Sequence, residues 1–452
     1  MARVLIVSHD VVASRMAGPG IRYWELARAL SRDHQVLLAC PNQTDLEGQG
    51  LGLVPYQRKD PDSLKQAAGW AQVIMLCGDT LELFPWLRAL GKPLVVDLYD
   101  PFILENLEMN RGFSRQEQET RQESGLRVLR GLLEAGDFFL CANGRQRDFW
   151  LGMLAAWGRL SPAVYSKDPS LQRLIALVPF GLASEPPRRL RPFLKGVWPG
   201  IGPQDVVLLW GGGLWDWLDP LTAVRAAAWL QSRRGDIRLF FMGTRHPDQQ
   251  HVPEMKMAKE ARRLSQELGL LDTHVFFNDW VPYHQRADCL LEADLGLSLH
   301  LDLVETRFSS RTRLLDYLWA GLPMVVTGGD PLADLVKGHG LGLLVAYRDV
   351  EGVGQAVLRL LESPRLKDEL APSFREVVSS LTWEESCQPL ARFCQDPYTT
   401  SGNRALAAAP WEPAGGQASA PIYGTDPPRV PGVVARALSR VPGIGTRLRN
   451  GP

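Results

Sequence analysis

The sequence predicts an α/β protein made of two consecutive Rossmann-like domains. Short apolar runs rich in Val, Ile and Leu alternate with helical patterns, as expected for parallel strands that helices cover on both faces. This alternation ends near residue 182 and restarts near residue 204, after a connector rich in Pro and Arg. The length of 452 residues suits at least two domains, each with its own core.

The first domain is predicted over residues 1–182 and the connector over 183–203. The expected strands of this domain are the apolar runs 4–8, 35–39, 73–77, 94–97, 138–141 and 175–178. Between the first two runs, apolar residues at positions 23, 26, 27 and 30 recur at helical spacing and predict an amphipathic helix. A strand, a glycine-containing loop, a helix and a strand form a right-handed crossover unit.

The second domain is predicted over residues 204–373. Its expected strands and helices are, in chain order, strand 205–210, helix 220–232, strand 237–242, helix 255–268, and strands 275–278, 295–299 and 324–327. A further helix is expected to start near Ser310 and to end at Gly321, with Pro323 beyond it.

Composition excludes several classes of protein. The 50 Lys and Arg residues balance 50 Asp and Glu residues, which argues against a nucleic-acid partner. The six Cys form no CxxC pair, so neither a zinc site nor a disulfide framework is expected, and a reducing compartment fits best. No stretch reaches the roughly 18 apolar residues of a membrane span, and the first apolar run is too short for a signal peptide. These features predict a cytoplasmic protein.

The last segment, residues 396–452, is rich in Pro, Gly and Ala, which predicts a disordered tail. Its end carries several Arg and no acidic residue. We interpret it as a solvated tail; the alternative is peripheral contact with anionic lipid at the inner face of the membrane.

Ligands of open parallel sheets bind beyond the carboxyl ends of the strands, so the residues that follow each strand are the candidates. In the first domain these are His9, the loop glycines Gly18 and Gly20 before the first helix, and Asp100. The glycines would let a helix N-terminus approach an anion. Asp100 precedes Pro101, so the alternative is a turn stabilised by the carboxylate. Because no GxGxxG fingerprint is present, a dinucleotide site is disfavoured.

In the second domain, Gly212, Gly213 and Trp215 follow the first strand. Glycines and a Trp at a strand end suit a ligand wall, although the Trp could instead plug a domain interface.

The richest stretch is the start of the helix near Ser310. Ser309 and Ser310 can cap it, and Arg311 and Arg313 add positive charge, which together suit a diphosphate. Asp316, further along the helix, can accept hydrogen bonds from the vicinal hydroxyls of a ribose. The alternatives are a solvated helix start and a surface carboxylate.

Four patterns resemble the retaining glycosyltransferases of family 4, over about residues 1–395. They are VLIVSHD…AGPGIRYWELARAL, LVPFGL, ADLGLSLH…SSRTRLLDYLWAGLPMVV and LTWEESCQPL. The resemblance implies the GT-B fold, in which two parallel sheets face each other across a cleft. It also implies that a C-terminal helix, residues 374–395, crosses back to the first domain.

The resemblance implies a nucleotide-diphosphate sugar as donor, bound mainly by the second domain, and a carbohydrate or lipid-linked acceptor on the first. No other cofactor is implied. Asp316 matches the second acid of the family's E-x7-E motif, whereas the first acid would fall at Phe308 and is missing; Glu305 is out of register. Trp280 and Val281 fall where relatives bind the base. The family's Arg and Lys pair after the glycine loop is not evident, and Arg311 or Arg313 could replace it.

We therefore predict a retaining, metal-independent hexosyltransferase of cell-surface polysaccharide, glycolipid or other glycoconjugate synthesis. Positive side chains and a helix N-terminus would stabilise the leaving diphosphate, which makes a metal dispensable. Asp100 or His9 would orient the acceptor, and Tyr99 with Asp100 resembles a family His-Asp pair near the transferred sugar. Alternative functions are a GT-B epimerase or phosphorylase and a non-catalytic nucleotide-sugar-binding partner; a dehydrogenase is disfavoured.

Overall fold

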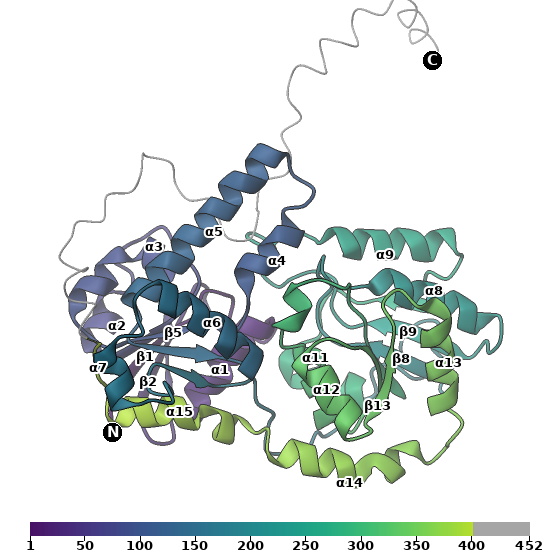
Figure 1. The fold of residues 1–452 in the computed structure, drawn as a ribbon. Helices are drawn as coiled ribbons and strands as arrows, with labels where there is room; N and C mark the ends of the chain where they lie inside the picture. The colour runs from purple at the N-terminus through teal and green to yellow at the C-terminus, as the bar shows by residue number, and fades with distance from the viewer. Residues whose placement is uncertain (401–452) are drawn as a thin grey trace, which may run out of the picture.

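The computed structural model describes residues 1–400, which form two lobes, each an α/β unit around a parallel sheet (Figure 1). The first sheet has the strand order β3-β2-β1-β4-β5-β6-β7 and the second β10-β9-β8-β11-β12-β13. Every neighbouring pair in both sheets is parallel. The predicted fold class of two Rossmann-like units is confirmed.

The strands of the first lobe are short, and the central strands β4, β5 and β6 are buried along their whole length. The strands are β1 (Arg3–Val7), β2 (Gln35–Cys40), β3 (Gly52–Pro55), β4 (Val73–Leu76), β5 (Leu94–Asp97), β6 (Phe138–Cys141) and β7 (Ile175–Leu177). The helices are α1 (Gly18–Leu30), α2 (Lys65–Trp70), α3 (Thr80–Leu83), η1 (Pro85–Leu90), α4 (Phe102–Met109), α5 (Arg115–Ala135), α6 (Gly144–Ala156) and α7 (Pro162–Lys167).

The second lobe repeats this alternation. Its strands are β8 (Val206–Trp210), β9 (Ile237–Phe241), β10 (Val275–Phe277), β11 (Leu295–Ser298), β12 (Met324–Thr327) and β13 (Gly342–Val345). Its helices are α8 (Pro220–Gln231), α9 (Lys256–Glu267), η2 (Tyr283–Gln285), α10 (Arg286–Glu292), η3 (Glu305–Arg307), α11 (Thr312–Trp319), α12 (Pro331–Gly338), α13 (Val350–Leu360) and α14 (Leu366–Ser379).

The chain returns to the first lobe through α15 (Trp383–Gln395), which packs against α1 (Figure 1). Leu182 at the end of the first lobe pairs with Thr382 in a parallel bridge, and the Phe393 ring stacks on Phe138 with centroids 4.7 Å apart. The predicted tail, residues 396–452, lies outside the described residues from 401 onward. Its described beginning contacts the first lobe, where the Thr400 amide donates a 2.7 Å hydrogen bond to the Asp137 carboxylate.

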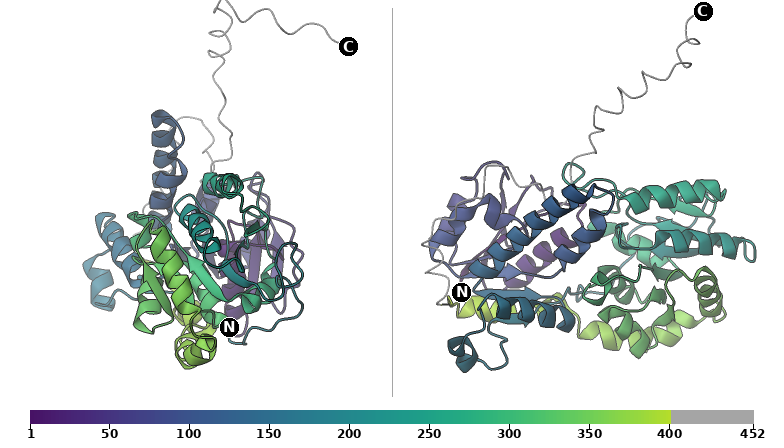
Figure 2. Two further views of the ribbon diagram at one scale, coloured as in Figure 1. Left: turned by 90° about the vertical axis from the view of Figure 1, so that its right-hand side faces the viewer. Right: turned by 45° about the horizontal axis from the view of Figure 1, so that its top comes forward.

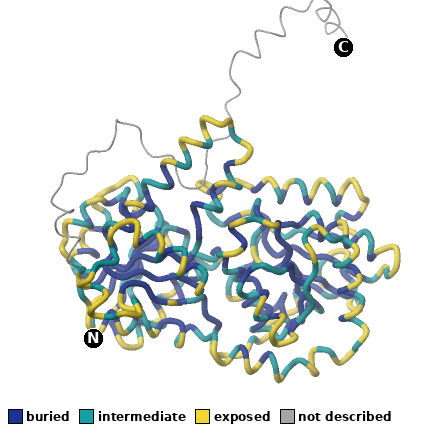
Figure 3. The backbone as a smooth tube through the Cα atoms, in the orientation of Figure 1, coloured by how far each residue is buried: buried dark blue, intermediate teal, exposed yellow. Residues whose placement is uncertain are grey.

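Both sheets form buried cores, while helices and loops carry the exposed residues (Figure 3). Helix α4 lies beside the gap between the lobes, and α5 projects from the first lobe (Figures 1 and 2). Along residues 1–400, none of the helices combines the length and the apolar character that crossing a membrane requires.

Candidate active site

The carboxyl ends of the two sheets face each other across a cavity of about 220 Å³ that both lobes line. Twelve of the residues predicted from sequence lie on its wall. They are His9, Gly18, Asp100, Gly212, Gly213, Trp215, Trp280, Ser309, Ser310, Arg311, Arg313 and Asp316. Strand ends that are up to 300 residues apart in sequence are thus brought to one site, as the strand-end rule predicts for parallel sheets.

Gly20 and Val281, both predicted to bind the donor, do not line this cavity. A Cβ atom on Gly20 would lie 2.2 Å from the Val11 carbonyl oxygen, so this glycine permits close packing inside the first lobe. Val281 is 6% exposed and belongs to the apolar core.

The start of α11 and the Arg313 side chain form the positively charged part of the wall. No side chain caps this helix, so its first N–H groups are not satisfied by a side chain. Arg313 is 8% exposed, lies over the Trp210 ring, and donates from Nη2 to the Gly213 carbonyl at 3.0 Å. Its Nη1 has no hydrogen-bond partner within residues 1–400. Burial lowers the pKa of Arg313 to about 10, with Arg311 adding to the effect, so the guanidinium is still charged at neutral pH.

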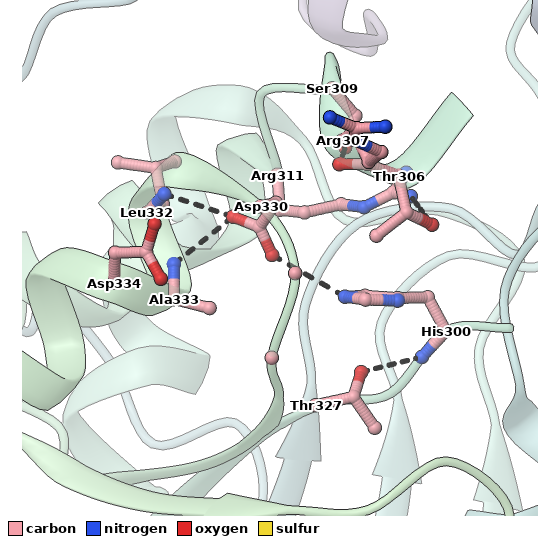
Figure 4. A network of polar contacts seen from close by, with 12 residues as sticks. His300, Thr306, Arg307, Ser309, Arg311, Thr327, Asp330, Leu332, Ala333 and Asp334 are labelled. Atoms are coloured by element: carbon pink, nitrogen blue, oxygen red, sulfur yellow. Dashed lines mark hydrogen bonds and ion pairs between the residues drawn. The ribbon is translucent and has the colours of Figure 1, made fainter. Parts of the chain in front are cut away.

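Arg311, predicted to be catalytic, forms an ion pair with Glu305. Its Nη2 donates to Glu305 Oε2 at 2.6 Å, and both side chains are buried. The same Nη2 also contacts the Thr306 hydroxyl at 3.4 Å; Arg311 and Thr306 lie next to the pair formed by His300 and Asp330 (Figure 4). Arg311 therefore contributes a largely neutralised guanidinium to the wall, whereas Arg313 pairs with no carboxylate within residues 1–400. Each of the two has one buried nitrogen without a partner among these residues, Nε in Arg311 and Nη1 in Arg313. The Glu305 carboxylate, in turn, does not line the cavity.

Asp316 lies one turn into α11, at one end of the cavity. Its Oδ1 accepts a 3.1 Å hydrogen bond from Arg286 Nε, and the Arg286 guanidinium lies over the rings of Tyr283 and Trp319. Burial raises the pKa of Asp316, and Arg286 opposes that rise. The Asp316 side chain is 31% exposed, so a hydroxyl-bearing ligand can reach its carboxylate.

Aromatic rings form the wall opposite the first lobe. The rings of Trp215 and Trp217 stack with centroids 5.3 Å apart and planes 9° from parallel. Trp280 lies across the glycine loop, 3.4 Å from a Cβ built on Gly213. Its Nε1 donates to the Met16 carbonyl at 3.2 Å, so this Trp also bridges the two lobes.

On the first lobe, His9 and Asp100 lie in surroundings that shift their pKa values. His9 Nδ1 is 2.8 Å from Cys77 Sγ, and burial lowers the His9 pKa. Burial and the neighbouring Asp97 raise the pKa of Asp100 to about 7. Asp97 itself is paired with Arg22 at 2.6 Å and is structural. Asp100 therefore titrates near neutral pH, as a residue that handles protons does.

Asp10, Glu105 and His246 are among the cavity residues that were not predicted from sequence. His246 Nε2 lies 3.4 Å from Asp10 Oδ2 and joins the lobes. Burial alone would lower the His246 pKa and raise that of Asp10, but their mutual attraction reverses both shifts. Asp10 and His246 both follow strands, so the strand-end rule could have found them; Glu105 is on a helix and gives no such signal.

The loop before α11 is held against the first lobe. Gln146 Nε2 and Asn143 Nδ2 donate to the Phe308 carbonyl at 2.8 and 3.2 Å. The Phe308 ring packs on Phe149 with centroids 4.8 Å apart. The position at which the resemblance places the first motif acid is therefore an apolar contact between the lobes.

Comparisons with known proteins agree with this architecture. Sucrose-phosphate synthase from Thermosynechococcus elongatus is similar at 17% identity, with a TM-score of 0.60 over 87% of this chain and 98% of that one. WaaG, a glycosyltransferase of lipopolysaccharide biosynthesis, is similar at 16% identity and a TM-score of 0.59, over 87% of this chain and all of WaaG (100%). Anabaena Alr3699/HepE, solved with UDP-glucose, matches at 14% identity and a TM-score of 0.58, over 87% of this chain and 100% of that one.

The fold and the cleft thus define a protein with the GT-B fold of glycosyltransferases. Residues 205–363, which span most of the second lobe, match the family described as glycosyl transferases group 1. A comparison with curated protein sequences found no match.

Proposed function

We propose that this protein is a glycosyltransferase that uses a nucleotide-diphosphate sugar. The observation that carries the proposal is Arg313, which lines the cavity between the lobes at the start of α11 and has a buried Nη1 without a partner within residues 1–400. A buried cation beside a helix N-terminus is a site for an anion, and a diphosphate supplies one of suitable size and charge.

The placement of the rest of the donor follows from this diphosphate site. If the diphosphate binds at Ser310 and Arg313, the Asp316 carboxylate, one turn into α11, would bind the ribose hydroxyls. Trp280 and the glycine loop at Gly212 would form the base pocket. Structural neighbours have been solved with UDP-glucose and with UDP-2-fluoro glucose, which makes uridine the first base to test.

Transfer requires cleavage of the bond between the anomeric carbon and the diphosphate oxygen. The electron pair goes to the diphosphate, where Arg313 and the α11 N-terminus would stabilise the added charge without a metal. In a retaining reaction the acceptor hydroxyl attacks from the face that the phosphate leaves, and its proton passes to the departing phosphate oxygen. Asp100 or His9 would orient that hydroxyl.

The proposed setting is cytoplasmic. All six cysteines are free and buried, which suits a reducing compartment. We propose a carbohydrate or lipid-linked acceptor and a role in cell-surface polysaccharide, glycolipid or other glycoconjugate synthesis. Peripheral membrane contact through the arginine-rich end of the tail is part of the same proposal.

The test is calorimetric titration with UDP, GDP, ADP and dTDP, followed by turnover assays with the sugar nucleotides of the best base. We expect one diphosphate to bind and its sugar donor to release that diphosphate when acceptors are added, with or without EDTA. Failure of all four diphosphates to bind would contradict the proposal. Binding without turnover would favour the non-catalytic partner, to which the missing acid at Phe308 lends support. Release of an altered sugar without an acceptor would favour an epimerase.

A further inference from the structure

In the loop before α11, neither position 308 nor Glu305 offers a carboxylate to the cavity. Phe308 packs its ring on Phe149, and Glu305 is 2% exposed, paired with Arg311 and absent from the cavity wall. A donor sugar presents several hydroxyls that need hydrogen-bonding partners in a cleft that excludes water. The partner must therefore come from elsewhere.

Glu105, on α4 of the first lobe, lines the cavity from the opposite side. Within residues 1–400 its carboxyl group is in no hydrogen bond and no ion pair. Asp100, Glu305 and Arg311 are the charged groups near enough to influence it. Burial, followed by the Asp100 and Glu305 carboxylates, raises the pKa of Glu105 well above its ordinary value, while Arg311 opposes the rise. The Glu105 carboxyl group therefore keeps its proton to a higher pH than an ordinary glutamate does.

A neutral carboxyl group both donates and accepts hydrogen bonds, which matches the dual character of a sugar hydroxyl. A second observation points to a ligand here. Arg311 is 6% exposed, lines the cavity, and has an Nε without a hydrogen-bond partner among the described residues. The region between Glu105 and Arg311 therefore holds unsatisfied polar groups from both lobes.

Position completes the argument. Arg313, assigned to the diphosphate, comes between Arg311 and Asp316 at the start of α11, and Asp316 is assigned to the ribose. Asp100 and Arg311 are among the charged groups that act on Glu105, so the three form a group on the Arg311 side of Arg313. A sugar attached to the second phosphate extends away from the ribose and so toward this group. The inference rests on the proposed function, since it takes the location of the diphosphate from it.

We propose that Glu105 binds hydroxyl groups of the transferred sugar and replaces, from the first lobe, the acid that the second lobe lacks at position 308. Helix α4 then selects the donor sugar, and the sugar is bound fully only when both lobes enclose it.

The experiment compares nucleotide with nucleotide-sugar affinity by calorimetry. The probes are UDP and UDP-glucose, or GDP and GDP-mannose if the wild type prefers guanosine. We expect Glu105→Ala to leave diphosphate affinity within about twofold and to weaken sugar-nucleotide affinity about tenfold, the scale of one or two lost hydrogen bonds. Glu105→Gln, which keeps a donor and an acceptor, should retain most of the sugar-nucleotide affinity.

Glu108→Ala is the matched control, because Glu108 is on the same helix, pairs with Arg111 and does not line the cavity. Equal losses for the diphosphate and its sugar in Glu105→Ala would indicate a structural role and overturn the inference, as would no loss for either. A wild type that binds no diphosphate would instead contradict the proposed function, so the two failures are distinguishable.

Discussion

Arg313 is the residue on which donor binding depends most directly. Its buried guanidinium has one donor satisfied by Gly213 and another unsatisfied, so a phosphate oxygen would complete its hydrogen bonds. We expect Arg313→Ala to weaken diphosphate binding by about 1.5–3 kcal/mol, the scale for hydrogen bonds to charged groups, and to slow transfer. Calorimetry and initial rates measure both effects. Arg307→Ala is the control, because Arg307 is exposed and absent from the cavity wall; equal effects of the two changes would refute the assignment.

A second prediction concerns the binding of the ribose by Asp316. We expect Asp316→Ala to weaken UDP binding by about 1–3 kcal/mol and to remove the preference for UDP over 2′-deoxy-UDP, because the carboxylate would bind the ribose hydroxyls. Titration of both nucleotides against both proteins gives this difference. A preference that survives in the variant would show that Asp316 only holds Arg286 at 3.1 Å.

At the residue scale, sequence reasoning predicted site residues that follow the ends of strands. It could not distinguish Arg311 from Arg313, because the difference is a buried pairing of Arg311 with Glu305, which precedes the predicted cap. Gly20 was misassigned because a glycine needed for packing looks the same as one needed for a ligand. Glu105 was missed because its role depends on the other lobe.

At the scale of elements, the buried runs were predictable, and so were the edge strands β7 and β10. The strands that were not predicted, β3 and β13, also lie at sheet edges, are only half-buried or exposed, and are four-residue runs that each begin with Gly. Helix α5 went unpredicted because its first half is strongly charged and projects from the lobe. The helix expected from Ser310 begins at Thr312, two residues later.

The return of α15 to the first lobe depends on Gly181. A Cβ atom there would lie 2.5 Å from the backbone nitrogen and Cα of Trp383, so the first turn of α15 would have to move. We expect Gly181→Ala to lower the free energy of unfolding by about 1–3 kcal/mol, the usual cost of overpacking. Urea denaturation measures this. Gly152→Ala on α6, where a Cβ meets nothing within 4 Å, should instead stabilise by up to about 1 kcal/mol; matching signs would contradict the argument.

For the whole molecule, the proposed function depends on the contacts between the two lobes. Trp280 donates to Met16, the Tyr283 amide donates to the Ser14 carbonyl at 2.8 Å, and the loop at Phe308 is held by α6. These contacts enclose the cavity on several sides, which limits water and the loss of donor by hydrolysis. Sequence patterns within one lobe carry no information about these contacts, so their pairing across the lobes could not be predicted.

The His246 and Asp10 pair makes the contact between the lobes depend on pH. The His246 pKa is raised above its ordinary 6.5, so its contribution is fully present below about pH 6.5 and is lost as pH rises through the raised value. The Asp10 pKa is lowered below its ordinary 3.8, so its contribution is present above about pH 3.8 and is lost as pH falls through the lowered value. The pair therefore stabilises the molecule most between these two limits. Asp248 and His9 are the other charged neighbours of the pair.

We expect a double-mutant cycle of His246→Gln and Asp10→Asn, followed by thermal unfolding, to show a coupling of about 1 kcal/mol or more at pH 5.5. The coupling should be smaller at pH 9, because raising the pH through the raised pKa of His246 removes the imidazolium charge. Because Asp248 remains in all four proteins, its attraction to His246 cancels in the cycle. A coupling that is equal at both pH values would mean that the two side chains only pack together, and the lobes would then be held by the pH-independent contacts of Trp280 and α6 alone.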